Sequence, residues 1–206
     1  YGGGSVIANG TLAEVRAALG GRMVSEFAGI EANPTYETLM RAVAQVKAGG
    51  LDYLLAVGGG SVIDGTKFVA AAACFAGDDP WQILEQGGGS VQAALPFASV
   101  LTLPATGSEM NCGSVITRQS TQSKLAFLSP LVFPQFSVLD PSKTFSLPPR
   151  QIANGVVDAF VHVMEQYLTY PVGAHVQDRL AEGLLHTLIE LGPQLLANPE
   201  DYDLRA

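Results

Sequence analysis

The stretch "YLLAVGGGSVIDGTK", residues 53–67, constrains the fold of this chain more than any other. An apolar run typical of a buried strand leads into three glycines, and a helical pattern begins directly after them. Glycines at positions 58–60 remove every Cβ between strand and helix, so backbone amides can approach a ligand at the positive end of the helix dipole. The spacing matches neither G-x-G-x-x-G nor G-x-x-x-x-G-K-[ST], so the stretch indicates a phosphate-binding turn without identifying its ligand.

Strands and helices alternate over the first two thirds of the chain. The pattern predicts a helix from Asn33-Pro34 to Gly49-Gly50 and a second helix over 62–76. It predicts strands over 53–57 and 97–103, with shorter β-prone runs near 114–118, 125–128 and 136–139. From residue 148 onward only helical patterns occur. We therefore expect an α/β domain with a parallel sheet over 1–145 and the beginning of an α-helical domain over 146–206.

Composition excludes several classes of function. Of 206 residues, 48% are hydrophobic and 15% charged, which is ample material for a core. The 11 basic and 19 acidic residues give a net charge of −8, which disfavours nucleic acid and anionic membrane as partners. No apolar run reaches the ~18 residues of a membrane span, and no signal peptide is visible. Two cysteines form no disulfide framework, and Cys74 is expected in the core, so a cytoplasmic protein is predicted.

The polar residues around the glycine turn leave two interpretations open. Ser61 either caps the helix or bonds a phosphate oxygen. Asp64 would repel phosphate, so in a functional role it is expected to bond a hydroxyl or amide of the ligand. The sequence "GGGSV" also occurs at 2–6 and 87–91; the third copy lacks a preceding strand, and we expect it to be a plain flexible loop.

A second polar stretch, "LTLPATGSEMNCGS" at 101–114, begins at the end of a predicted strand. It places small hydroxyl groups and an amide around a glycine turn, and such groups suit a polar, uncharged ring such as nicotinamide. An ordinary polar turn is an equally good interpretation. The residues concerned are Thr102, Thr106, Ser108, Glu109 and Asn111.

Asp158 and His162 stand four residues apart on a predicted helix and project from the same face. A carboxylate oxygen and an imidazole nitrogen at this spacing form a two-point metal clamp. A buried Asp–His hydrogen bond or a half-exposed pair would explain the spacing equally well. Two ligands do not complete a tetrahedral site. His175 and His186 are expected to be structural.

Taken together, the motifs resemble the iron-containing (group III) alcohol dehydrogenases, and are most similar to the branch of NADPH-dependent butanol dehydrogenases and broad-range aldehyde reductases. The likeness extends over nearly the whole chain. It rests on "GGGSVIDGTKF", "LTLPATGSE", "LAFLSP", "VLDP", "LPPRQIANGVVDAFVHVMEQY" and "AEGLLHTLIE". As a set in this order, these motifs are highly specific.

The resemblance implies a Rossmann-like domain that binds NADP(H) and a helical domain that binds a divalent metal, Fe2+ or Zn2+. It implies that Asp158 and His162 are two of four metal ligands. In the opening "YGGGS", the glycines leave room for a 2′-phosphate that Ser5 can bond, which favours NADP. The cofactor-binding residues implied are Gly3, Gly4, Ser5, Asn33, Gly59, Gly60, Ser61, Asp64, Thr102, Thr106, Asn111 and Lys124.

The activity implied is hydride transfer between the nicotinamide and a small aldehyde or primary alcohol, in a cytoplasmic homodimer. Two departures from the family pattern matter. The family's other two metal ligands are histidines of later helices, and this sequence ends before them. The strand that precedes "YGGGS" in the family is absent as well. We therefore expect the middle half of an enzyme, with weak metal binding and no turnover in isolation. The alternatives are a glycerol dehydrogenase or dehydroquinate synthase type on the same scaffold, a nucleotide-binding module without catalysis, and a purely structural Asp158–His162 pair buried against protein groups.

Overall fold

The computed structural model of the chain describes residues 1–22 and 24–206 and contains two compact units. The first, here called the α/β unit, comprises Tyr1–Thr102 and Gly107–Leu139. The second, the helical unit, comprises Leu103–Thr106 and Asp140–Ala206. The fold class expected from the sequence is confirmed, while the domain limit at residues 145 and 146 stays a prediction.

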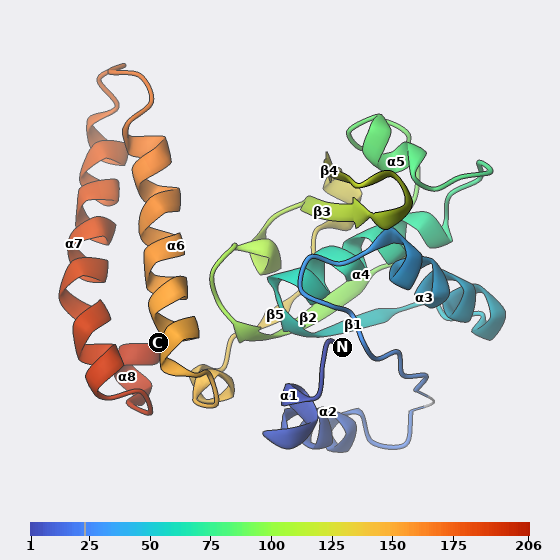
Figure 1. The fold of residues 1–206 in the computed structure, drawn as a ribbon, viewed down its shortest axis with the longest axis horizontal. Helices are drawn as coiled ribbons and strands as arrows, with labels where there is room; N and C mark the ends of the chain where they lie inside the picture. The colour runs from blue at the N-terminus through green and yellow to red at the C-terminus, as the bar shows by residue number, and fades with distance from the viewer. Residues whose placement is uncertain (23) are drawn as a thin grey trace. The chain divides into compact units, whose positions relative to one another are not determined.

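The α/β unit is built on a three-stranded sheet in the order β1-β2-β5 (Figure 1). Its strands are β1 (Leu54–Gly59), β2 (Phe97–Leu103) and β5 (Ser137–Val138). Strands β2 and β5 run parallel, with Ser99 opposite Ser137 and Val100 opposite Val138. Helix α4 (Gly60–Ala73) begins directly after β1 and carries the chain back towards β2, as a βαβ crossover requires.

Helices cover both faces of this sheet because successive strand residues point to opposite sides. Helices α3 (Tyr36–Gly49) and α4 lie on one face, and α1 (Ser5–Ala8) and α2 (Thr11–Leu19) on the other (Figure 1). Ala56 belongs to the core cluster shared with α3 and α4, whereas its neighbour Val57 packs with Val6 and Leu12 of α1 and α2. The sheet is therefore the middle layer of three.

The two β-prone runs near 114–118 and 125–128 do not join the parallel sheet. They form an antiparallel hairpin of β3 (Gly113–Arg118) and β4 (Ser123–Leu128), in which Gly113 pairs with Leu128 and Arg118 with Ser123. The connection between them is the single turn η2 (Gln119–Thr121). Parallel strands need a crossover of about a dozen residues, so this connection permits only a hairpin.

An aromatic and ionic cluster fastens the hairpin to the rest of the α/β unit. The Arg118 guanidinium lies 4.8 Å from the ring centre of Tyr36 and 5.5 Å from that of Trp81, at cation–π distance. Its Nη1 atom is 2.9 Å from Asp79 Oδ2, and the Tyr36 hydroxyl donates to the other oxygen of Asp79 at 2.5 Å. The cluster fixes β3 against α3.

Two expectations about small residues are wrong. The third "GGGSV" copy, expected to be a plain flexible loop, is a packed turn after α5 (Gln82–Glu85): Gly88 has φ +96°, and a Cβ there would lie 2.1 Å from the Leu128 carbonyl oxygen. Cys74, expected in the core, is exposed because it is the C-cap of α4, past the buried part of that helix.

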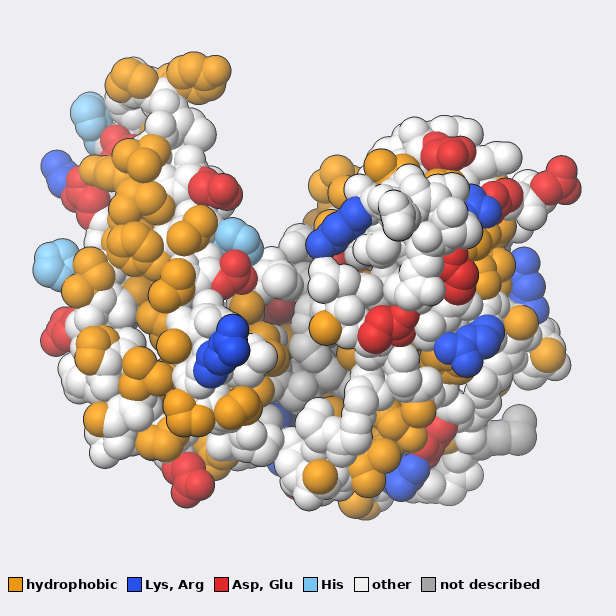
Figure 2. Space-filling model, viewed as in Figure 1, with side chains coloured by type: hydrophobic (Ala, Val, Ile, Leu, Met, Phe, Trp, Pro, Cys, Tyr) orange, Lys and Arg blue, Asp and Glu red, His pale blue; other side chains and the backbone are white. Residues whose placement is uncertain are grey.

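The helical unit contains α6 (Pro149–Tyr167), α7 (His175–Ala197) and α8 (Tyr202–Arg205), so the helical character expected after residue 148 is confirmed. Helices α6 and α7 approach closely at Gly192, where a Cβ would lie 2.9 Å from Val156 Cγ1. Many apolar side chains of these helices stay exposed, and Figure 2 shows hydrophobic side chains along α7. Among residues 1–22 and 24–206, the short 3₁₀ segments are η1 (Ser108–Met110), η2, η3 (Pro130–Val132) and η4 (Pro141–Thr144). Among the described residues, no helix is both long enough and apolar enough to cross a bilayer.

Candidate functional site

The glycine turn between β1 and α4 has the geometry of a phosphate-binding turn. Gly59 is the N-cap of α4 and makes no side-chain cap, and Gly60 is the first helical residue. A Cβ at Gly58 would lie 2.6 Å from Val62 Cγ2, so only glycine fits there. The first amides of a helix have no intrahelical acceptor and carry its partial positive charge. The turn therefore offers N–H groups to an anion.

Three predicted cofactor residues from distant parts of the sequence meet beside this turn. The Asn33 backbone N–H donates to Ser61 Oγ at 3.4 Å, and Lys124 Nζ, on β4, donates to Asn33 Oδ1 at 2.8 Å. Ser61 does not cap α4, so that interpretation of the residue is wrong. Asn33 has φ +57°, a left-handed conformation that asparagine tolerates better than most residues. A hydroxyl, an amide and an ammonium group thus surround the helix start.

The opening segment of the chain also lies against α4. The Gly2 carbonyl accepts from the Gly29 N–H at 3.0 Å, and a Cβ at Gly2 would lie 3.2 Å from Val62 Cγ2. Gly3 and Gly4 follow directly, and a Cβ at either of them would meet nothing within 4 Å. The open space at both positions is compatible with a ligand group beside the start of α4.

The carboxylate of Asp64 is engaged by protein groups. Its Oδ1 accepts from Ser108 Oγ at 2.6 Å and its Oδ2 from the Val115 N–H at 3.0 Å. The Asn111 side-chain oxygen accepts from Lys67 Nζ at 2.8 Å. These bonds join α4 to the segment that follows β2, so Asp64 and Asn111 belong to one network. Their roles in cofactor binding stay predictions.

Lys67 is the residue that the sequence interpretation missed. Its side chain is fully buried, and burial lowers its pKa to about 8, against the attraction of Asp64, Cys112 and Glu109. The sequence does carry a signal for the burial of Lys67, because it is a lone lysine among small and apolar residues in the helix sequence "GTKFVAAAA". A lysine in such a context is rarely buried without partners for its charge.

Thr102 lies half-buried near the end of β2, and Thr106 is exposed in the turn after that strand. Hydroxyl groups at the carboxyl end of a strand in an α/β sheet lie where such sheets bind ligands. Their contact with the cofactor stays a prediction.

Asp158 and His162 form a half-exposed pair on α6. Asp158 Oδ1 and His162 Nε2 are 3.9 Å apart, and the side chains are 43% and 46% exposed. That separation is too long for a hydrogen bond. The purely structural interpretation required both groups to be buried, which they are not. Oxygen and nitrogen donors with free lone pairs on one helix face suit a divalent metal. Within the described ranges, no cluster of three or more His, Cys, Asp or Glu side chains surrounds a common point.

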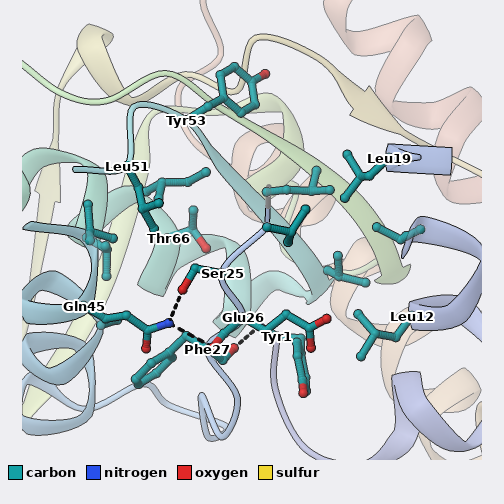
Figure 3. A pocket seen from close by; sticks show the side chains of 18 of the residues that line it. Tyr1, Leu12, Leu19, Ser25, Glu26, Phe27, Gln45, Leu51, Tyr53 and Thr66 are labelled. Carbon is teal, nitrogen blue, oxygen red and sulfur yellow. Dashed lines mark hydrogen bonds between the residues drawn. The ribbon is translucent and has the colours of Figure 1, made fainter. Parts of the chain in front are cut away.

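A cavity of about 740 Å³ lies elsewhere in the α/β unit (Figure 3). Apolar side chains of α2, α3 and β1 line most of it. Its polar border includes Gln45, whose Nε2 donates to Ser25 Oγ at 2.7 Å and to the Glu26 carbonyl at 3.0 Å. No residue predicted to hold the cofactor is among those lining this cavity. The candidate nucleotide site is therefore the amide-rich surface at the start of α4, and not this apolar space.

Comparison with known families identifies the class of protein. Residues 1–141 match the family model described as iron-containing alcohol dehydrogenase. Residues 152–206 match the C-terminal model of the Fe-containing alcohol dehydrogenase family. The chain belongs to the iron-containing alcohol dehydrogenase family, and the resemblance inferred from the motifs is confirmed.

Individual relatives are similar over the whole chain. The NADPH-dependent aldehyde reductase YqhD of Escherichia coli K12 is 60% identical over 100% of this chain and 54% of its own length. A probable NADH-dependent butanol dehydrogenase of Bacillus subtilis is 48% identical over 100% of this chain and 53% of its own. The chain thus spans about half the length of these relatives.

Solved structures show the same fold. The crystal structure of E. coli K-12 YqhD has a TM-score of 0.97 at 60% identity and covers 100% of this chain and 53% of that chain. NADH-dependent butanol dehydrogenase A from Thermotoga maritima has a TM-score of 0.93 at 38% identity. The match covers 100% of this chain and 52% of that chain.

Proposed function

We propose that this chain is part of a metal-dependent, NADP(H)-linked alcohol dehydrogenase that reduces small aldehydes or oxidises primary alcohols. The observation that carries the proposal is the meeting of Asn33, Ser61 and Lys124 at the glycine turn. Family membership supports the reaction class. The preference for NADP is supported by the 60% identity to a reductase named for NADPH.

Within this proposal, the α/β unit holds the cofactor, which supplies the hydride. The amides of Gly59, Gly60 and Ser61 bind the diphosphate at the start of α4. The Lys124 ammonium adds a positive charge beside Asn33 and reaches the ribose and nicotinamide end. Thr102, Thr106 and Asn111 line the nicotinamide. The Asp64 carboxylate lies near the diphosphate site, where it accepts hydrogen bonds from the Ser108 hydroxyl and the Val115 N–H.

The helical unit contributes two metal ligands, the Asp158 carboxylate and the His162 imidazole. When bound, a divalent metal supplies Lewis acidity that polarises a carbonyl group. The mixed oxygen and nitrogen set fits both Fe2+ and Zn2+. The remaining ligands are proposed to come from parts of a longer enzyme outside residues 1–206, in keeping with the half coverage of the relatives.

Further parts of the proposal concern organisation and place in the cell. The α/β domain is proposed to extend over 1–145 and the helical domain over 146–206, and the enzyme is proposed to be a cytoplasmic homodimer. Light scattering of the full-length protein measures the assembly directly, and the mass of one subunit would contradict the dimer.

An activity assay with the full-length protein tests the function. Aldehyde-dependent oxidation of NADPH that requires added Fe2+ or Zn2+ is the expected result. NADPH binding without oxidation would instead indicate a nucleotide-binding module, and turnover of glycerol with NAD+ in preference to aldehydes would indicate the glycerol dehydrogenase type.

Replacing Gly3 by aspartate is expected to weaken the preference for NADPH over NADH. The new side chain fits, because a Cβ at Gly3 meets nothing within 4 Å. Its carboxylate would repel a 2′-phosphate, and about 1.4 kcal/mol of repulsion raises the KM for NADPH about 10-fold. The KM for NADH should change little. Gly3→Asn, of the same size but uncharged, is the control, and an equal effect of both variants on both coenzymes would remove Gly3 from the phosphate site.

A further inference from the structure

The side chain of Lys67 closes a hydrogen-bond network around the second turn of α4. Its ammonium group donates to Ser108 Oγ at 2.9 Å, to Asn111 Oδ1 at 2.8 Å and to the Gly113 carbonyl at 2.8 Å. All three acceptors belong to the segment 108–113 that follows β2. Ser108 in turn donates to Asp64, one turn earlier on α4. The three N–H bonds of one cation thus hold a whole segment against the helix.

The protonated form of Lys67 is needed to satisfy this network. An ammonium group has three N–H donors, one for each of these acceptors, whereas a neutral amine has two and cannot bond all three acceptors at once. Burying an ammonium is tolerated only when its protons are all paired. The charge of Lys67, which is fully buried, therefore serves to hold the segment 108–113 in place.

This network joins the two ends of the candidate cofactor site. Asp64 and Lys67 follow the glycine turn on α4, and Asn111 is one of the residues proposed to line the nicotinamide. Resting on the function proposed above, we propose that Lys67 is a positioning residue for the cofactor: its ammonium group sets the place of the nicotinamide-lining segment relative to the diphosphate-binding helix start. Lys67 touches no reacting atom in this role.

The role predicts a specific pH dependence. Burial lowers the pKa of Lys67 from 10.5 to about 8, and the groups that face it are Asp64 on α4, Glu109 on η1 and Cys112 before β3. Above pH 8 the folded protein loses this proton, so cofactor affinity should fall as pH rises. Between pH 8 and 10.5 the unfolded chain binds more protons at Lys67 than the folded chain, so this group alone makes the folded state more stable with rising pH. Weaker binding in this range would therefore not reflect unfolding caused by Lys67.

Fluorescence titration of the full-length protein with NADPH at pH 7 and pH 9.5 tests the inference. For the wild type we expect the Kd to rise about 10-fold between the two values, as the protonated fraction falls. Lys67→Met should bind NADPH about 10-fold more weakly at pH 7, because methionine cannot make the hydrogen bonds that the charged ammonium group donates. Its Kd for NADPH should depend little on pH. Cys112→Ser removes the ionisable thiol and should still lose NADPH affinity between pH 7 and pH 9.5, which separates the titration of Lys67 from that of the neighbouring thiol. Lys47→Met, which removes an exposed lysine of α3, should change neither value.

A milder variant and a second readout cover the case in which Lys67→Met does not fold. Ser108→Ala removes only the hydroxyl between Lys67 and Asp64 and should weaken NADPH binding about 3-fold. Without cofactor, amide exchange at Val115, whose N–H bonds Asp64, should be faster in this variant. A wild type that binds neither NADPH nor NADH would refute the proposed function. A wild type that binds NADPH equally at both pH values, with Ser108→Ala unchanged, would refute the role of Lys67 alone.

Discussion

Replacing Asp158 or His162 by alanine in the full-length protein is expected to abolish metal-dependent aldehyde reduction and leave NADPH binding intact. Each variant loses one of the two donor groups that α6 presents. Lewis-acid stabilisation contributes several kcal/mol to such reactions, so kcat should fall by about 10³-fold. Bound metal, measured by elemental analysis of the purified protein, should fall in parallel. NADPH affinity should be unchanged, because the residues proposed to bind the cofactor at the glycine turn lie on other elements.

His186→Ala is the matched control for this pair. His186 is exposed on α7 and is assigned no metal role, so its removal should preserve metal content and kcat. Retained aldehyde reduction in both Asp158→Ala and His162→Ala would end their assignment as metal ligands.

Gly58→Ala is expected to damage both the fold and cofactor binding. The added Cβ would lie 2.6 Å from Val62 Cγ2 and 2.8 Å from Val62 Cβ. Valine has little rotamer freedom in a helix, so the backbone of the turn must shift instead. Overpacking of this kind costs about 2–3 kcal/mol in unfolding free energy. The shift also misplaces amides that each contribute about 1.5–3 kcal/mol to binding a charged group, so NADPH affinity should fall about 100-fold.

Gly183→Ala is the control for this substitution. Gly183 lies within α7, and a Cβ there meets nothing within 4 Å. Alanine is favoured over glycine in a helix by up to about 1 kcal/mol, so stability should stay equal or rise. Thermal unfolding and fluorescence titration measure both effects. Full NADPH affinity in Gly58→Ala would show that the turn is not the diphosphate site.

The elements of this fold follow from local patterns in the sequence. The strand before Gly58 and the helix after Gly60 are read from an apolar run, a glycine break and helical spacing. The shared face of Asp158 and His162 follows from the period of a single helix. In each case the decisive interactions lie within a few residues, which is why sequence spacing is sufficient to predict them.

Long-range contacts could not be predicted in this way. The hydrogen bond from Lys124 to Asn33 joins residues 91 positions apart, and spacing carries no signal for it. The burial of Lys67 depends on acceptors that arrive from residues 108–113. Likewise, the β-prone runs near 114–118 and 125–128 were predicted as strands, but their separation into a hairpin depends on the short turn between them.

The most direct test of the central claim is a crystal structure of the full-length protein with NADP+. The account predicts diphosphate oxygens about 3 Å from the backbone amides of Gly60 and Ser61, with Lys124 beside the ribose. A nucleotide bound in the apolar cavity, or anywhere that leaves the start of α4 without a phosphate, would contradict it.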